Sequence, residues 1–214
     1  MMKFVKVFFL LGIVSAQLLQ AGGYYLPKKQ KVIIEKTYNK GAVKRILSLV
    51  DLMNKLYSKS DKEKLLAVNK FFNEVPYASD MKTYKRKDYW ANRTEFLGRD
   101  RGDCEDYTFA KYFTLVQLDV SKTKMKAFYC KSLTYNQAHM VLAYFRKPRS
   151  VPFILGNYNY KILPATKRTD LKPIKLYNGD ALYIAKLKKQ GKVVPGSKKA
   201  ALEWIEIINS IRRK

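Results

Sequence analysis

Cys104 is the residue whose surroundings most clearly suggest chemistry, because it lies among acids in a strongly basic chain. The stretch RGDCEDYTFAKYF (residues 101–113) places Asp103, Glu105 and Asp106 beside the thiol, although the chain has 43 Lys and Arg against 17 Asp and Glu. The residues after Cys104 predict a helix that begins at the cysteine. The positive end of a helix dipole favours the thiolate, which is the nucleophilic form. Cys104 is therefore a candidate nucleophile.

A thiolate nucleophile needs a partner that carries its proton, and His139 is the only histidine in the chain. It lies in the strand-like run AHMVLAYF (residues 138–145), and it is the imidazole that would assist Cys104. The alternative is that both are structural, an inert buried thiol and a core imidazole satisfied by backbone groups.

The second cysteine, Cys130, lies mid-strand between Tyr129 and Lys131 with no polar cluster near it. That position favours a structural side chain. A disulfide with Cys104 stays open, because an exported chain meets an oxidising compartment, yet two thiols alone do not establish a bond.

The three acids next to Cys104 raise its pKa by like-charge repulsion unless something cancels their charge. A bound divalent cation would do so, and carboxylate oxygens are the hard ligands that Ca²⁺ prefers. The alternative is an ordinary helix start, in which Asp103 caps the helix and Glu105 favours its positive end.

The elements that must position these residues begin with helices. The spacing predicts an amphipathic helix over 40–57, and Ser60 with Glu63 forms a capping box for a second helix that starts near Asp61 and ends before Pro76. Residues 77–102 lose any period and are expected to form a long, functional connection. Its aromatic residues either line a substrate groove or pack the core; they are Tyr89, Trp90 and Phe96.

The second half of the chain has strand patterns. A third helix is expected from Cys104 to about Leu118, followed by strands over 124–131, 138–145 and 152–160 and a last helix over 198–212. Helices followed by consecutive strands predict an α+β fold with an antiparallel sheet.

The first residues fit an export signal. Lys3 and Lys6 precede an apolar run over 7–14 and the small residues Ser15 and Ala16. The alternative, a membrane anchor, needs about 20 uninterrupted apolar residues. We therefore expect a signal peptide over 1–21, a single domain over 22–214, and export.

The net charge of +26 is spread along the whole chain, and no nucleic-acid-binding motif accompanies it. We therefore expect no nucleic-acid partner. Long-range attraction to anionic lipid headgroups or to an acidic protein fits a dispersed charge better.

Three stretches resemble the LapG-type bacterial transglutaminase-like cysteine proteases, a family of exported papain-like enzymes. The stretches are YWANRTEFLGRDRGDCEDYTFAKYFTLVQLDV (89–120), AHMVLAYF (138–145) and PFILGNYN (152–159). The resemblance implies that Cys104 in GDCEDY and His139 in AHMVL are catalytic. It also implies a papain- or transglutaminase-like fold, in which the cysteine begins a helix packed on an antiparallel sheet that carries the histidine.

The resemblance further implies calcium dependence, with Asp103 and Glu105 as ligands; Asp106 matches the family stretch but is not placed on the metal. It implies a periplasmic protease that cuts a large cell-surface adhesin near its N-terminus to control biofilm attachment. A membrane-bound receptor protein would sequester the enzyme, which we expect to be a monomer.

One position departs from the family pattern. The third catalytic residue is an aspartate in a VLDN-type segment, and here that segment is Ile154-Leu155-Gly156-Asn157. Gly156 thus removes the carboxylate that orients the histidine, a loss that weakens catalysis by orders of magnitude. Asn157 replaces it only with a bulge or a one-residue shift, because adjacent strand residues face opposite sides. Water or a backbone carbonyl is another orienting group.

Three functions follow from these observations. The first is a calcium-dependent exported thiol protease that passes through an acyl-enzyme at Cys104. The second is a weakened or inactive relative that keeps the calcium site and uses its basic surface to hold a partner. The third is a transglutaminase or amidase, which uses the same thiol and imidazole.

Overall fold

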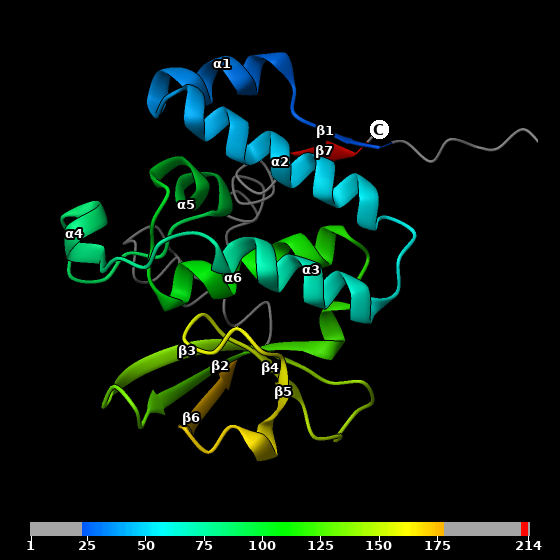
Figure 1. Ribbon diagram of the computed structural model, residues 1–214, viewed down its shortest axis with the longest axis vertical. Coiled ribbons are helices and arrows are strands. Elements are labelled where there is room, and N and C mark those ends of the chain that lie inside the picture. The colour runs from blue at the N-terminus through cyan, green and yellow to red at the C-terminus, as the bar shows by residue number, and fades with distance from the viewer. Residues whose placement is uncertain (1–22, 178–210, 214) are drawn as a thin grey trace, which may run out of the picture.

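The computed structural model describes residues 23–177 and 211–213, and the findings below concern this part of the chain. The helices lie together on one side and a five-stranded sheet lies on the other (Figure 1). The helices and 3-10 turns are α1 Lys28–Thr37, α2 Lys40–Leu56, α3 Asp61–Asn73, α4 Asp80–Tyr84, α5 Arg93–Arg99, α6 Cys104–Gln117, η1 Lys122–Lys124 and η2 Ala165–Lys167. The strands are β1 Tyr24–Tyr25, β2 Met125–Ser132, β3 Gln137–Tyr144, β4 Phe153–Leu155, β5 Leu163–Pro164, β6 Leu171–Tyr177 and β7 Arg212–Arg213.

The main sheet is antiparallel throughout, with the strand order β5-β4-β3-β2-β6, and β1 pairs separately with β7. Helix α6 lies between the other helices and the sheet, since it packs on α3 and on β3 (Figure 1). The predicted α+β fold is therefore confirmed, and the helix that begins at Cys104 packs on the strand that carries His139.

The helices expected over 40–57 and from Asp61 are confirmed as α2 and α3. At the start of α3 the Ser60 hydroxyl accepts a hydrogen bond from the Glu63 backbone N–H, and the Glu63 carboxylate accepts one from the Ser60 N–H. This reciprocal cap satisfies amides that a helix start leaves without partners.

The prediction for residues 77–102 was wrong, because this segment contains α4 and α5. Both helices are too short for a periodic pattern to show. Helix α5 is instead fixed by a capping box in which Asn92 and Glu95 bond each other's backbone N–H. Trp90 is 3% and Phe96 0% exposed, so these two aromatic residues belong to the core rather than to an open groove.

The later elements also differ from the expected ones. The strand expected over 152–160 is only the three residues of β4, and β6 was not predicted. Residues 198–210 of the expected last helix lie outside the described part of the chain. Arg212, its expected last residue, belongs to β7, where it pairs with Tyr25.

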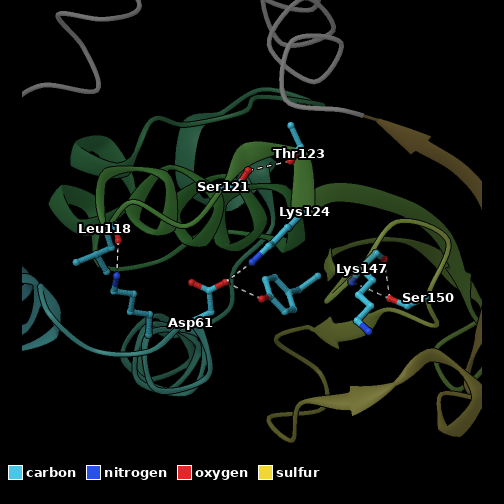
Figure 2. Close-up of polar contacts among 9 residues, drawn as sticks. Asp61, Leu118, Ser121, Thr123, Lys124, Lys147 and Ser150 are labelled. Carbon is cyan, nitrogen blue, oxygen red and sulfur yellow. Dashed lines mark hydrogen bonds and ion pairs between the residues drawn. The ribbon is translucent and has the colours of Figure 1, made fainter.

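Asp61 joins α3 to the sheet layer, as Figure 2 shows. Its Oδ2 accepts hydrogen bonds from Lys124 Nζ at 3.0 Å and the Tyr144 hydroxyl at 2.7 Å. Close by, Lys64 Nζ donates to the Leu118 carbonyl at 2.7 Å. Burial raises the pKa of Asp61, but the bonds from Tyr144 and Lys124 outweigh it, and the pKa lies below its ordinary value.

Replacing Asp61 by asparagine is expected to lower the free energy of unfolding by about 1–2 kcal/mol at pH 7, because two charge-assisted bonds weaken. A lowered pKa stabilises the fold above the unfolded-state value near 4, and this contribution is lost as pH falls through the folded-state value. The difference between Asp61→Asn and the parent should therefore shrink in acid. Urea unfolding at several pH values checks it, with the exposed Asp51→Asn as control; an equal loss in both variants would contradict the role of Asp61.

Candidate active site

Cys104 is the first residue of α6, and the backbone before it turns tightly around Asp106. Asp106 Oδ1 accepts a hydrogen bond from Ala91 N at 2.7 Å, and its Oδ2 accepts one from Asp103 N at 3.3 Å. Gly102 permits this approach, because a Cβ there would overlap Asp106 Oδ2 and the Phe96 ring. Asp106 thus holds the loop against the helix start.

The Cys104 thiol is 6% exposed and lies 2.8 Å from Glu105 Oε2, to which it donates a hydrogen bond. Burial, followed by the charges of Glu105 and Asp103, raises its pKa well above the ordinary value for a cysteine. These effects outweigh the backbone hydrogen bond from Met140, which favours the thiolate, so the thiol stays protonated at neutral pH unless a cation offsets the acids.

His139 lies on β3, and the residue after it contacts the start of α6. A backbone hydrogen bond from Met140 reaches Cys104, and the Thr108 hydroxyl lies 2.9 Å from the Cys104 carbonyl oxygen and 3.1 Å from that of Met140. The predicted nucleophile and base thus come from elements that are joined here, although they are 35 residues apart in sequence.

The imidazole does not bond to the thiol in this structure. Within the described residues neither ring nitrogen of His139 has a hydrogen-bond partner, and the ring is stacked on Tyr158 with centroids 4.1 Å apart and planes at 5°. Tyr77 and Tyr135 pack edge-on against Tyr158 from outside. The histidine is fully buried beneath this aromatic cluster. Catalytic hydrogen bonds are often long or misaligned in substrate-free enzymes.

His139 is expected to titrate with a pKa of about 4, because burial and then the charge of Arg168 disfavour the imidazolium. An unfolded histidine titrates near 6.5, so the stabilising contribution is complete above about pH 6.5 and is lost as pH falls toward 4. An NMR titration of ¹⁵N-histidine-labelled protein reads this single imidazole. Tyr158→Ala, which uncovers the ring, should move the midpoint upward; a midpoint near 6.5 in the parent protein would contradict the burial.

Gly156 directly follows β4 and lies against His139. Its carbonyl oxygen accepts hydrogen bonds from Asn73 Nδ2 at 2.9 Å and from the buried Lys111 Nζ at 3.1 Å, which fix the backbone at this position. A Cβ built on Gly156 would lie 3.9 Å from His139 Nε2. A side chain at position 156 would therefore lie beside the imidazole, and an aspartate there would place its carboxylate near His139 Nε2.

Asn157 does not take the place of the missing aspartate in this structure. It is 8% exposed, and among the described residues its Oδ1 has no hydrogen-bond partner, nor has either nitrogen of His139. Asn157 and His139 are thus not hydrogen-bonded. The role of Asn157 as an orienting residue stays a prediction without a supporting contact.

Two overlapping groups of acidic ligand atoms surround the start of α6. Asp103, Cys104 and Glu105 form one group and Asp80, Asp103 and Asp106 the other, with the ligand atoms of each group within 4.8 Å of one another. Asp103 Oδ1 is buried and has no hydrogen-bond partner among the described residues. Burial, then the charges of Glu105, Asp106 and Asp80, raises the pKa of Asp103 to about 10. Closely spaced hard oxygens with an unbonded carboxylate oxygen fit a calcium ion.

Two residues of this region carry no recognisable signal in the sequence. Asp80 was not predicted, because it begins the short helix α4 within a segment that carried no pattern, and only the fold brings it to Asp103. Arg168 was not predicted either; it lies after η2, and its guanidinium reaches Gly156 and acts on His139. No sequence signal distinguishes it from the many other basic residues.

The structure also bears on the possible Cys104–Cys130 disulfide and on the expected membrane or export segment. Cys104 and Cys130 are both free, and Cys130 lies opposite His139 in the β2–β3 pair. The proposed signal peptide, residues 1–21, lies outside the described part of the chain. Among the residues that the structure describes, no helix is long and apolar enough to span a membrane.

Comparisons with known proteins agree on one family. Residues 50–177 match the profile of the bacterial transglutaminase-like cysteine proteinases. The structure is similar to that of Legionella pneumophila LapG, with a TM-score of 0.63 and 34% sequence identity over 85% of this chain and 94% of that chain. The calcium-bound form of Legionella pneumophila LapG matches with a TM-score of 0.64 and 34% sequence identity, over 76% of this chain and 98% of that chain. The EGTA-treated form matches with a TM-score of 0.62 and 34% identity, over 85% of this chain and 95% of that chain. No curated protein sequence matches the chain significantly.

Proposed function

Because the chain belongs to the bacterial transglutaminase-like cysteine proteinase family, we propose that Cys104 is the nucleophile and His139 the proton carrier of an exported, calcium-dependent endopeptidase. The observation that carries this proposal is the junction of α6 and β3. It places Cys104 at the start of α6, beside the backbone of Met140. Met140 directly follows His139, the only histidine in the chain.

The chemistry follows from these two side chains. His139, neutral at physiological pH, takes the proton of the Cys104 thiol, and the sulfur attacks a peptide carbonyl. The imidazolium then gives this proton to the leaving amine, and an acyl-enzyme remains at Cys104. Water attacks the acyl group while His139 accepts its proton and returns it to the departing sulfur, which releases the second product. Backbone amides at the positive end of α6 are suited to stabilise the oxyanion.

Asp103 and Glu105, joined by Asp80, would hold calcium. Positive charge from a bound Ca²⁺ would offset the carboxylates that keep Cys104 protonated. A calcium-bound form is known for LapG, which supports the same requirement in this chain.

The substrate and setting that we propose rest on the likeness to LapG. They are a large cell-surface adhesin, cut near its N-terminus in the periplasm to control biofilm attachment, and a membrane-bound receptor protein that sequesters the monomeric enzyme. The test is incubation of the purified protein with N-terminal adhesin fragments in calcium and in EGTA, with products read by mass spectrometry. We expect cleavage that requires calcium and is lost in Cys104→Ser; cleavage unchanged in Cys104→Ser would overturn the proposal.

A binding module is the second candidate, and Gly156 favours it. Without the aspartate, no described residue holds the imidazole by a hydrogen bond. In that case the chain would bind its protein partner and calcium but leave the adhesin intact. Binding of the fragments without any cleavage in calcium would support this candidate over the protease.

A further inference from the structure

Arg168 carries an unusual buried charge beside the histidine. Its side chain is 1% exposed, and two of its nitrogens are paired with one carboxylate: Nε donates to Asp170 Oδ1 at 2.8 Å and Nη2 to Asp170 Oδ2 at 2.7 Å. The third nitrogen, Nη1, is buried and has no hydrogen-bond partner among the described residues. Leaving a charged donor unbonded in the interior is costly, so this nitrogen calls for an acceptor.

The unbonded nitrogen faces the place where Gly156 lacks a side chain. From the position of a Cβ on Gly156, the nearest atoms are Val141 Cγ1 at 3.2 Å, Arg168 Nη1 at 3.7 Å and His139 Nε2 at 3.9 Å. His139 Nε2 is likewise buried and unpartnered. Two polar groups that can both donate hydrogen bonds thus converge on the position that a side chain at 156 would take, where the Val141 methyl is the tightest neighbour.

The charges around this space favour an anion. The charges of Arg168 and Lys111 disfavour the imidazolium of His139, and Asp170, whose charge opposes them, is already bonded to Arg168 through both oxygens. Lys111 is bonded to Asn73 and to the Gly156 carbonyl. A carboxylate would accept from Arg168 Nη1 and from His139 Nε2 in charge-assisted geometry.

We propose that Gly156, Arg168 and His139 form a binding site for a small carboxylate anion of the size of formate, which supplies from solution the carboxyl group that the chain lacks at position 156. This inference rests on the proposed function, since it assigns an activator to the same histidine. The bound anion accepts the Nε2 proton and leaves Nδ1 as the basic nitrogen, the tautomer in which the imidazole can take up the thiol proton.

The backbone sets the size of the anion. Formate has the three heavy atoms of a carboxyl group, whereas acetate adds a methyl where the Cβ of an aspartate would be, about 1.5 Å from the glycine Cα. Formate is therefore expected to bind and acetate to bind much more weakly. Chloride, a single spherical acceptor without the two separate oxygens of a carboxylate, serves as the control for ionic strength.

The first measurement is a titration of ¹⁵N-histidine-labelled protein with sodium formate. We expect a saturable shift of the imidazole resonances of His139, with little change in acetate or chloride. Gly156→Ala is the matched control, because its Cβ takes the position beside both nitrogens and leaves Arg168 in place. It should abolish the shift while the protein stays folded, with a melting temperature lowered only by the close contact with Val141. No saturable shift in the parent, or the same shift in Gly156→Ala, would overturn the site.

The second measurement is the rate of Cys104 alkylation by iodoacetamide in calcium. Formate should accelerate it by about 10-fold to 100-fold, part of what an orienting carboxylate supplies, and have no further effect in Gly156→Asp. If Gly156→Asp reacts rapidly but formate does not accelerate the parent, the anion site is wrong and the proposed function stands. If Cys104 stays unreactive even in Gly156→Asp, the proposed function fails. The anion site is then still tested by the formate-dependent shift of the His139 imidazole resonances.

Discussion

Replacing Gly156 by aspartate is expected to raise peptide cleavage and Cys104 alkylation by up to about 10⁴-fold, the loss seen when the carboxylate of a catalytic triad is removed. The new Cβ would lie 3.9 Å from His139 Nε2 and 3.7 Å from Arg168 Nη1, which brings both nitrogens within reach of the carboxylate. Arg168 would keep this carboxylate ionised. The backbone at Gly156 is not in the left-handed region, so an L-residue is not strained there.

Two control variants separate the effect of the carboxylate charge from the effect of adding a side chain at position 156. Val141 Cγ1 must yield by a few tenths of an ångström to any Cβ at 156, so Gly156→Ala carries the same packing cost without the charge. Gly156→Asn adds an acceptor but no charge, and should recover only part of the gain. Cleavage rates with a peptide substrate decide the matter. If Gly156→Asp reacts no faster than Gly156→Ala, another group already orients His139.

Calcium is expected to raise the melting temperature by about 5–10 °C at a concentration 100 times its dissociation constant, since such binding stabilises the fold by about 2.7 kcal/mol. The acids concerned are Asp103 and Glu105 of one group of ligand atoms and Asp80, which lies near Asp103 in the other group. Without calcium, burial and then the charges of the neighbouring acids disfavour the Asp103 carboxylate, which destabilises the fold. Asp103→Asn should therefore be more stable than the parent in EGTA and less stable than the parent in calcium.

This reversal of sign distinguishes a metal site from a helix cap. If Asp103 only capped α6, Asp103→Asn would change stability equally in calcium and in EGTA. Asp80→Asn tests whether Asp80, which only the folded structure brings near Asp103, is also a calcium ligand. The variant Asp51→Asn, at an exposed position, should behave as the parent in both conditions. Thermal melts and calorimetric titration with Ca²⁺ provide the readouts. A parent protein that melts at the same temperature with and without calcium would contradict the site.

Local sequence signals predicted the elements that begin with a clear cap or carry a long period. The capping box at Ser60, the apolar spacing in 40–57 and the acid-rich start at Cys104 each correspond to a helix with nearly the expected bounds. The strands β2 and β3 were also expected, because each is eight residues long. The order of helices and strands then sufficed for the fold class.

The remaining parts depend on contacts between distant segments. Helices α4 and α5 have only five and seven residues, and β4 has three, so their formation is decided by packing and caps rather than by periodicity. Asp80 joins Asp103, and Arg168 reaches Gly156, only after the chain has folded. The family resemblance located the missing carboxylate at Gly156, whereas the unbonded nitrogen of Arg168 beside it became visible only in three dimensions.

The central claim is that Cys104 is a nucleophile assisted by His139. The most direct measurement is the rate of Cys104 alkylation in calcium, followed by mass spectrometry across pH in the parent and in His139→Ala. Cys130, which is fully buried, is the internal control that should stay unlabelled. We expect Cys104 to be labelled at neutral pH faster than a free cysteine peptide, and at least about 10-fold more slowly in His139→Ala than in the parent. Labelling no faster than the free peptide, and unaffected by the loss of His139, would contradict it.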